Sequence, residues 1–151
     1  MNAIETQLLL VEDNEDDVFL MQRAFEKSKL TLPMRVICDG QEALDYLRGV
    51  GQYSDRQKCP LPAAIFLDLK LPYIHGFEIL KWIRQDAATR HIPVYVLTSS
   101  LEERDRRQAI ELGAQDYLVK PPSPQMLVSV ASLLGLSGAV LAPMSSSVVA
   151  A

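Results

Sequence analysis

The sequence of 151 residues predicts an α/β fold, a doubly wound parallel sheet with helices on both faces. Short apolar runs alternate throughout the chain with segments whose apolar residues recur at helical spacing. The run at 63–67 is uncharged and leads directly to Asp68, and such a run is typical of a strand buried on both faces of a parallel sheet. The end of such a strand is also where open α/β sheets bind ligands.

The first strand is expected at 7–11, where the apolar run Leu-Leu-Leu-Val ends at two acidic residues. Asn14, a residue type that caps helices, begins a helix that reaches Phe25 or slightly beyond. Asp17 in its first turn suits the positive end of the helix dipole. Three apolar residues at helical spacing should face the core: Val18, Met21 and Phe25.

A second, edge strand is expected at 34–38, and Asp39-Gly40 turns the chain into a short helix at 41–48. The residues of this helix that should face the core are Ala43, Leu44 and Leu47. The segment 49–62 combines glycine, proline and charged residues and predicts a long loop. Long loops inside compact domains are usually functional or mobile.

The third strand, 63–68, leads into a turn with Pro72 and Gly76 and then into a helix at 75–85. The residues of this helix that should face the core are Phe77, Leu80 and Ile83. A fourth strand follows at 93–97, where Pro-Val-Tyr-Val-Leu is again uncharged.

Ser100 and Glu103 form a capping-box pattern for the next helix, which Gly113 ends. The last strand is expected at 115–119, and Ser123-Pro124 opens the last helix. Its apolar residues should face the core: Met126, Leu127, Val130, Leu133 and Leu134.

Composition excludes several classes of protein. Hydrophobic residues make up 48% of the chain and charged residues 23%, which is ordinary for a globular domain. The net charge of −4 gives no basic footprint for nucleic acid. Cys38 and Cys59 have no metal-ligand or redox spacing, so we expect reduced cytosolic thiols. The N-terminus carries no secretory signal, and we expect a cytoplasmic protein.

The segment 121–151 carries no charged residue. Its apolar part, 126–142, is long enough to raise the alternative of a membrane span. Serines, glycines and the lack of a basic residue on its far side argue against a span, as does the need for 126–134 as the last helix. We therefore expect no membrane partner and a mobile tail at 135–151.

Every expected strand except the second ends at a residue that can do chemistry: Glu12, Asp13, Asp68, Thr98 and Lys120. Alone, Asp68 could equally start a turn. In a parallel sheet, however, all these strand ends meet at one edge. Clustered carboxylates favour a hard cation such as Mg²⁺. A carboxylate can also form an acyl phosphate, for which Thr98 and Lys120 would supply a hydroxyl and a positive charge.

The sequence resembles the receiver domains of two-component response regulators over residues 6 to about 134. The matching segments are Val11-Glu12-Asp13-Asn14, Leu67-Asp68, Pro72 with Gly76, Leu97-Thr98-Ser99 and Val119-Lys120-Pro121. The resemblance implies a flavodoxin-like (βα)5 sheet with strand order 2-1-3-4-5. It also implies a receiver domain at 1–134, followed by the uncharged tail at 135–151.

The resemblance implies that Asp68 accepts a phosphoryl group from the phosphohistidine of a sensor histidine kinase. Glu12, Asp13, Asp68 and the backbone carbonyl of Lys70 would bind Mg²⁺.

Thr98 and Lys120 would contact the phosphoryl group, and the Lys120–Pro121 bond would be cis, which would aim the lysine into the site. Tyr117 occupies the position of the family's switching aromatic residue and would turn inward when Thr98 is drawn to the phosphoryl group. The alternative for Tyr117 is a strand tyrosine that is simply packed half inward.

The long loop at 49–62 and the run Asn14-Glu-Asp-Asp17 are similar to those of small stand-alone regulators paired with bacterial phytochromes. The expected partners are therefore a sensor histidine kinase, which this similarity suggests is a phytochrome, and a downstream target or phosphotransfer protein. The sequence leaves open a homodimer. It also leaves open whether the cluster Arg104-Asp-Arg-Arg107 is a docking surface or a solvated helix face.

We therefore predict a single-domain response regulator that is no enzyme beyond its own Mg²⁺-dependent phosphorylation and dephosphorylation. A phosphate-independent binding module with the receiver fold remains the alternative. A flavin or nucleotide binder would need a glycine- and hydroxyl-rich cradle where the acidic run 12–17 stands. An aspartate-nucleophile phosphatase would usually carry a second acid where Lys70 stands.

Overall fold

The computed structural model describes residues 7–134, and the predicted tail at 135–151 lies outside them. One five-stranded parallel sheet has the order β2-β1-β3-β4-β5. The elements are β1 (Leu8–Val11), α1 (Glu15–Ser28), β2 (Met34–Ile37), α2 (Gly40–Arg48), the 3₁₀ turn η1 (Gly51–Tyr53), β3 (Ala64–Leu67), α3 (Gly76–Gln85), β4 (Val94–Thr98), α4 (Glu103–Glu111), β5 (Asp116–Val119) and α5 (Pro124–Leu133). The predicted fold class and strand order are confirmed.

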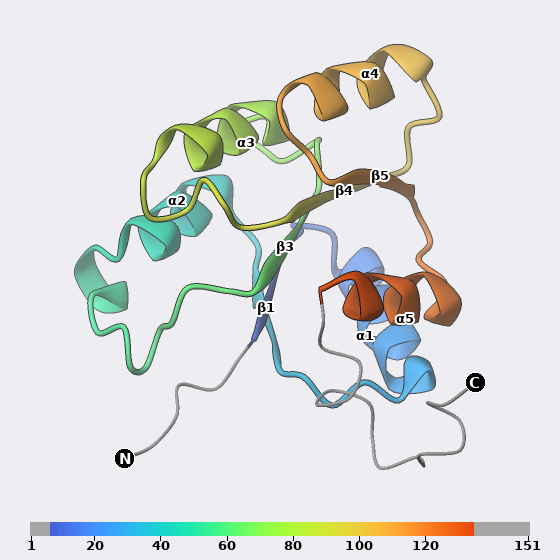
Figure 1. The fold of residues 1–151 in the computed structure, drawn as a ribbon, viewed down its shortest axis with the longest axis horizontal. Helices are drawn as coiled ribbons and strands as arrows, with labels where there is room; N and C mark the ends of the chain where they lie inside the picture. Colours follow the sequence, from blue (N-terminus) through green and yellow to red (C-terminus); the bar gives the residue numbers. More distant parts are fainter. Residues whose placement is uncertain (1–6, 135–151) are drawn as a thin grey trace.

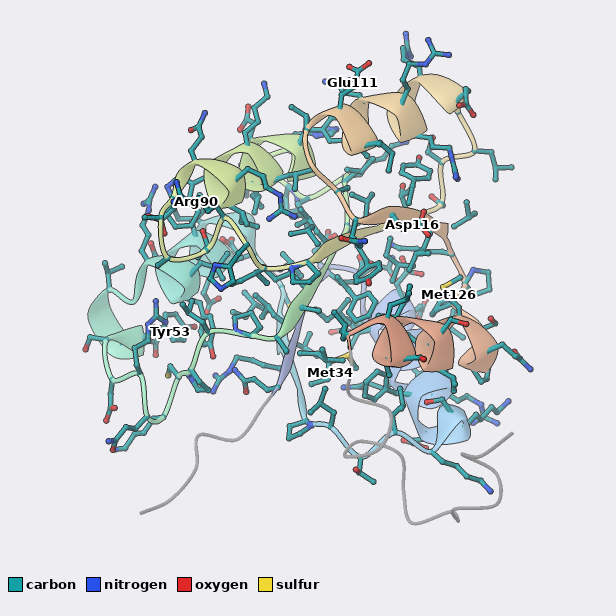
Figure 2. The ribbon with its side chains drawn as sticks, in the orientation of Figure 1. Met34, Tyr53, Arg90, Glu111, Asp116 and Met126 are labelled. Atoms are coloured by element: carbon teal, nitrogen blue, oxygen red, sulfur yellow. The ribbon has the colours of Figure 1, made fainter. Side chains whose placement is uncertain are left out.

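The sheet separates two layers of helices: α1 and α5 lie on one face, and α2, α3 and α4 on the other (Figure 1). Successive side chains of a strand point to opposite faces. Leu8 and Leu10 of β1 accordingly pack with α1 and α5, whereas Leu9 and Val11 pack with the other layer. Side chains fill the space on both sides of the sheet (Figure 2), which explains why its inner strands carry no charge.

The predicted residues cap three of the helices. The side chain of Asn14 accepts a hydrogen bond from the backbone N–H of Asp17 at 3.0 Å, which satisfies a donor that α1 leaves free. Asp39 and Ser123 cap α2 and α5 in the same way.

The capping box predicted for α4 is wrong. The N-cap residue is Glu102, which makes no side-chain capping bond. The Ser100 hydroxyl instead donates to the Asp105 carboxylate at 2.8 Å and accepts from the N–H of Glu102 at 3.2 Å. Ser100 therefore organises the turn that precedes the helix, and this turn delays the start of α4 to Glu103.

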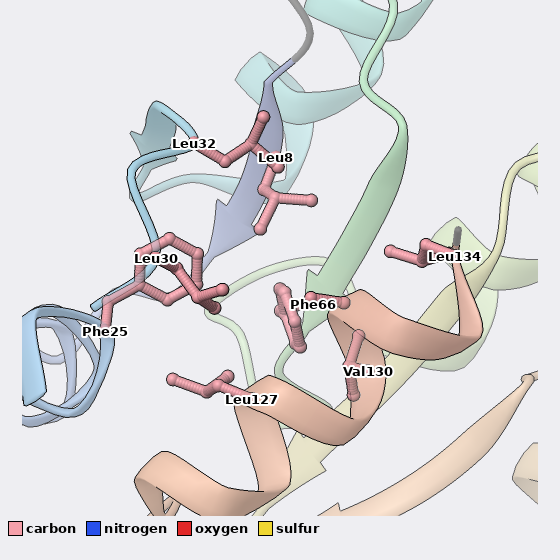
Figure 3. A pocket seen from close by; sticks show the side chains of 9 residues that line it. Leu8, Phe25, Leu30, Leu32, Phe66, Leu127, Val130 and Leu134 are labelled. Atoms are coloured by element: carbon pink, nitrogen blue, oxygen red, sulfur yellow. The ribbon is translucent and has the colours of Figure 1, made fainter. Parts of the chain in front are cut away.

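The prediction that Leu133 faces the core is also wrong, because its side chain is 76% exposed. The buried stripe of α5 is formed by Leu127, Val130 and Ala131, which face α1 and the sheet. Leu133, the last residue of the helix, falls outside this stripe. The stripe borders a small apolar pocket, seen in Figure 3 between α1, α5 and the sheet. Its lining residues are Leu8, Phe25, Leu30, Leu32, Phe66, Leu127, Val130, Ala131 and Leu134.

Helix α5 has 10 residues, whereas a membrane-spanning helix needs about 20. Within residues 7–134, no helix is long and apolar enough to cross a bilayer. The rest of the apolar segment 126–142 lies outside the described residues.

The segment 49–62 is anchored to α2. The Arg56 guanidinium donates to the carbonyl oxygens of Tyr46 at 2.8 Å and Leu47 at 2.7 Å, in the last turn of α2. It also donates to the carbonyl oxygen of Cys59 at 3.2 Å. One side chain therefore satisfies the carbonyl end of α2 and holds the loop against it.

Candidate functional site

Backbone hydrogen bonds place the predicted site residues at one edge of the sheet. The N–H of Asp68, just after β3, donates to the carbonyl oxygen of Val11 at 3.1 Å. The N–H of Lys120, just after β5, donates to the carbonyl oxygen of Thr98 at 2.8 Å. Both bonds continue the parallel ladders, so the site residues inherit the register of the strands.

Three carboxylates meet at this edge. One oxygen atom from each of Glu12, Asp13 and Asp68 lies within 4.8 Å of the others. Glu12 is 1% exposed and Asp68 is 6% exposed, whereas Asp13 lies open to solvent. The cluster therefore has a buried side and an accessible side.

Lys120 brings a positive charge into the acidic cluster. Its Nζ lies 2.5 Å from Glu12 Oε1, 2.8 Å from Asp17 Oδ2 and 3.4 Å from Asp68 Oδ1. The side chain is 11% exposed, so these contacts are screened less than surface ion pairs. The Lys120–Pro121 peptide bond is cis, as the resemblance implied.

Burial raises the pKa of Glu12 to about 7, and the nearby charge of Asp68 adds to this effect, while the hydrogen bond with Lys120 opposes it. Burial alone would lower the pKa of Lys120, but its hydrogen bonds with Asp17 and Glu12 outweigh burial and raise it. The ammonium group therefore stays charged, while the carboxylate form of Glu12 is destabilised. A bound cation would relieve that cost.

The carboxylate oxygen atoms of this cluster are suitable ligands for a hard divalent cation. Glu12, Asp13 and Asp68 supply only oxygen atoms, and the exposed side leaves room for water, as Mg²⁺ requires. Lys70, whose carbonyl oxygen is the fourth predicted ligand, follows Asp68 by two residues in the same loop. Its side chain is exposed.

A glycine shapes the loop that carries Asp68. A Cβ atom at Gly76 would lie 2.4 Å from the carbonyl oxygen of Asp68 and 2.8 Å from the Cα of Leu69. The N–H of Gly76 also donates to the carbonyl oxygen of Leu69 at 2.8 Å. The start of α3 therefore packs against the backbone of the phosphoacceptor candidate, and only glycine fits there.

Thr98 and Tyr117 both form hydrogen bonds with the backbone of Ser100. Thr98 Oγ1 accepts a hydrogen bond from the N–H of Ser100 at 3.2 Å. The Tyr117 hydroxyl donates to the carbonyl oxygen of Ser100 at 3.0 Å. Tyr117 is 4% exposed, so its ring points inward rather than lying half-packed at the surface. The movement predicted for this ring on phosphorylation stays a prediction.

Sequence reasoning missed the role of Asp17 in the site. Its position in the first turn of α1 was explained by the helix dipole alone. In the structure the Asp17 carboxylate reaches Lys120 across the edge of the sheet. The helix start predicted at Asn14 puts Asp17 one turn beyond the strand end, but this spacing does not show in which direction its side chain points.

Comparison with known proteins decides the family. The sequence-family model of the response regulator receiver domain matches residues 8–132 of this chain. The chain belongs to the response regulator receiver domain family. It is a receiver domain with the flavodoxin-like fold, similar to single-domain regulators of phosphorylation-based signalling.

Two receiver proteins illustrate the similarity. The probable methanogenesis regulatory protein FilR2 of Methanothrix harundinacea is 41% identical over 119 residues, which cover 77% of this chain and 72% of FilR2. The structure of the bacteriophytochrome response regulator RtBRR is 43% identical, with a TM-score of 0.76 over 87% of this chain and 78% of RtBRR.

The Mn²⁺-bound form of the response regulator Rcp1, a Synechocystis protein, is 32% identical, with a TM-score of 0.73 over 91% of this chain and 99% of Rcp1. Other relatives are longer than this chain. The match to the transcriptional regulator PhoB of Escherichia coli covers 37% of PhoB.

Proposed function

We propose that this receiver domain stores a signal as a phosphoryl group on Asp68. The observation that carries the proposal is the meeting of three carboxylates and one lysine at the carboxyl edge of a parallel sheet. Asp68 lies within reach of both the other acids and Lys120. A carboxylate in such surroundings is suited to accept a phosphoryl group.

The phosphoryl donor would be a phosphohistidine of a sensor histidine kinase. A carboxylate oxygen of Asp68 attacks phosphorus, the P–N bond to the histidine breaks, and its electron pair returns to the imidazole. Thr98 and Lys120 then stabilise the negative charge on the phosphoryl oxygens. Attack of water on phosphorus then breaks the P–O bond to Asp68 and releases inorganic phosphate and the free carboxylate, so the domain needs no enzymatic activity beyond its own phosphorylation and dephosphorylation.

Glu12, Asp13, Asp68 and the carbonyl oxygen of Lys70 would hold Mg²⁺. The ion supplies positive charge that neutralises phosphoryl oxygens. Rcp1, a relative of this chain, has a structure described as its Mn²⁺-bound form, which supports the binding of a divalent cation by this fold. The raised pKa of Glu12 is consistent with a pocket that is completed by a cation.

Phytochrome-type kinases are the partner that we propose for signal input. RtBRR and AtBRR, which are 43% and 41% identical to this chain, are both described as bacteriophytochrome response regulators. Output would pass by protein contact to a downstream target, a phosphotransfer protein or a second copy of the chain. The test is the rate of phosphotransfer from phosphorylated phytochrome kinases. Transfer no faster than from unrelated sensor kinases would contradict this partner.

The experiment that tests the proposed function is intact mass spectrometry after incubation with acetyl phosphate and Mg²⁺. One added phosphoryl group is expected, and none is expected for Asp68→Asn or in the presence of a chelator. Asp13→Asn should also lose most of the adduct, whereas Asp16→Asn, an exposed residue of α1, should not. The absence of any adduct, together with no binding of beryllofluoride, would favour the phosphate-independent binding module.

A further inference from the structure

Lys120 is held by more acidic groups than its proposed role requires. An ammonium group has three donors, and three carboxylates lie within ion-pair distance of it. Two of these, Glu12 and Asp68, belong to the acidic cluster. The third, Asp17, lies outside that cluster and comes from the first turn of α1.

The distances indicate where the ammonium group is drawn. Nζ of Lys120 lies 2.5 Å from Glu12 and 2.8 Å from Asp17, but 3.4 Å from Asp68. Asp68 is the residue that would carry the phosphoryl group. The contact with Asp17 is a charge-assisted hydrogen bond of normal length, whereas the contact with Asp68 is an ion pair only. Glu12 and Asp17 together therefore hold the ammonium group closer to themselves than to Asp68, and of these two only Asp17 lies outside the acidic cluster.

We propose that Asp17 is a positioning residue that holds Lys120 on the α1 side of the site and competes with the phosphoryl group for it. This inference rests on the proposed function of Asp68. The phosphoryl oxygens can interact fully with the Lys120 ammonium group only when the hydrogen bond between Lys120 and Asp17 lengthens. Asp17 thus lowers the stability of the phosphorylated state and helps to set the lifetime of the signal.

The substitution Asp17→Asn isolates this effect. It keeps the size of the side chain, and the cap of α1 uses the backbone N–H of residue 17, which the substitution retains. Asp16→Asn is the matched control, because it removes the same charge from the same helix turn at an exposed position. Asp17→Glu keeps the negative charge and tests whether that charge alone is enough to compete with the phosphoryl group for Lys120.

The measurement is the affinity for beryllofluoride, a phosphoryl mimic, at saturating Mg²⁺ by isothermal titration calorimetry. We expect Asp17→Asn to bind about threefold to tenfold more tightly than the unmodified chain, as loss of one partly exposed ion pair predicts. Asp16→Asn and Asp17→Glu should stay within about twofold. Equal or weaker binding by Asp17→Asn, or the same gain in Asp16→Asn, would overturn the proposal.

A double-mutant cycle separates this effect from a general change in charge. In the Lys120→Met background, Asp17→Asn should no longer change beryllofluoride affinity, because the cation for which the groups compete is absent. A gain that persists in this background would overturn the role of Asp17. If the unmodified chain binds no beryllofluoride at all, the proposed function fails, and this inference fails with it.

Discussion

The hydroxyl group of Tyr117 in β5 donates a hydrogen bond to the carbonyl oxygen of Ser100, in the loop before α4, at 3.0 Å. The N–H of the same Ser100 donates to Thr98 Oγ1 at 3.2 Å. Ser100 is therefore hydrogen-bonded to both proposed switching residues. Its N–H contacts Thr98, the proposed phosphoryl-binding residue, and its carbonyl oxygen contacts Tyr117. A shift of Thr98 would therefore act on Tyr117 through a single residue.

Tyr117→Phe removes the hydroxyl but keeps the buried ring. We expect the free energy of unfolding to fall by about 1 kcal/mol, the usual loss for one hydrogen bond, when it is measured by urea denaturation. Tyr73→Phe is the control, because that side chain is 99% exposed and the change should cost less than about 0.5 kcal/mol. Equal effects of the two substitutions would argue against a stabilising bond between Tyr117 and Ser100.

The grouping of the site residues was more predictable than the contact between Asp17 and Lys120. Parallel strands bring their carboxyl ends to one edge whatever the details of packing, so Glu12, Asp68 and Lys120 could be grouped from the sequence. The contact between Asp17 and Lys120 depends on the rotation of α1 and on the reach of a long side chain. Neither quantity is encoded in the spacing of residues along the chain.

The capping-box prediction was wrong because two sets of hydrogen bonds compete for the side chain of Ser100. Ser100 and Glu103 satisfy a capping-box pattern, but Ser100 bonds Asp105 and the turn before α4 instead. Side-chain hydrogen bonds within a turn compete with helix caps, and a short pattern cannot decide between them. The anchoring of the loop at 49–62 was missed for a different reason, since the role of Arg56 depends on how the chain folds back onto α2.

Gly76→Ala should disturb both the fold and the site. The added Cβ would meet the backbone of Asp68 at 2.4 Å, so the loop or α3 must shift. We expect the free energy of unfolding to fall by about 2–4 kcal/mol, together with weaker binding of Mg²⁺ in a calorimetric titration.

Gly51→Ala is the control for that substitution. Gly51 has a φ of +59° but no atom within 4 Å of a Cβ, so only backbone strain of about 1 kcal/mol is expected. Mg²⁺ affinity should not change, because Gly51 lies in η1, outside the acidic cluster. An equal loss of Mg²⁺ affinity in both variants would mean that the contact at Gly76 does not position Asp68.

Glu12 should make stability depend on pH when Mg²⁺ is removed by a chelator. Its pKa is about 7 in the folded chain against an ordinary value of 4.5, so the folded state binds the proton more tightly. The free energy of unfolding should therefore fall as pH rises between these values, by on the order of 2–3 kcal/mol. Glu12→Gln should remove this slope in urea denaturation at a series of pH values. Parallel pH profiles for the two chains would contradict the raised pKa.

Arg56→Ala should loosen the loop at 49–62, because three carbonyl oxygens lose their shared donor. We expect the free energy of unfolding to fall by about 1–3 kcal/mol, with faster hydrogen exchange in this loop and at the end of α2. Lys58→Ala, which removes an exposed cation from the same loop, should change stability by less than about 0.5 kcal/mol. Arg56→Lys should resemble Arg56→Ala, since a single ammonium group cannot reproduce the planar fork of the guanidinium. Unchanged exchange in Arg56→Ala would show that buried Tyr53 and Cys59 hold the loop without it.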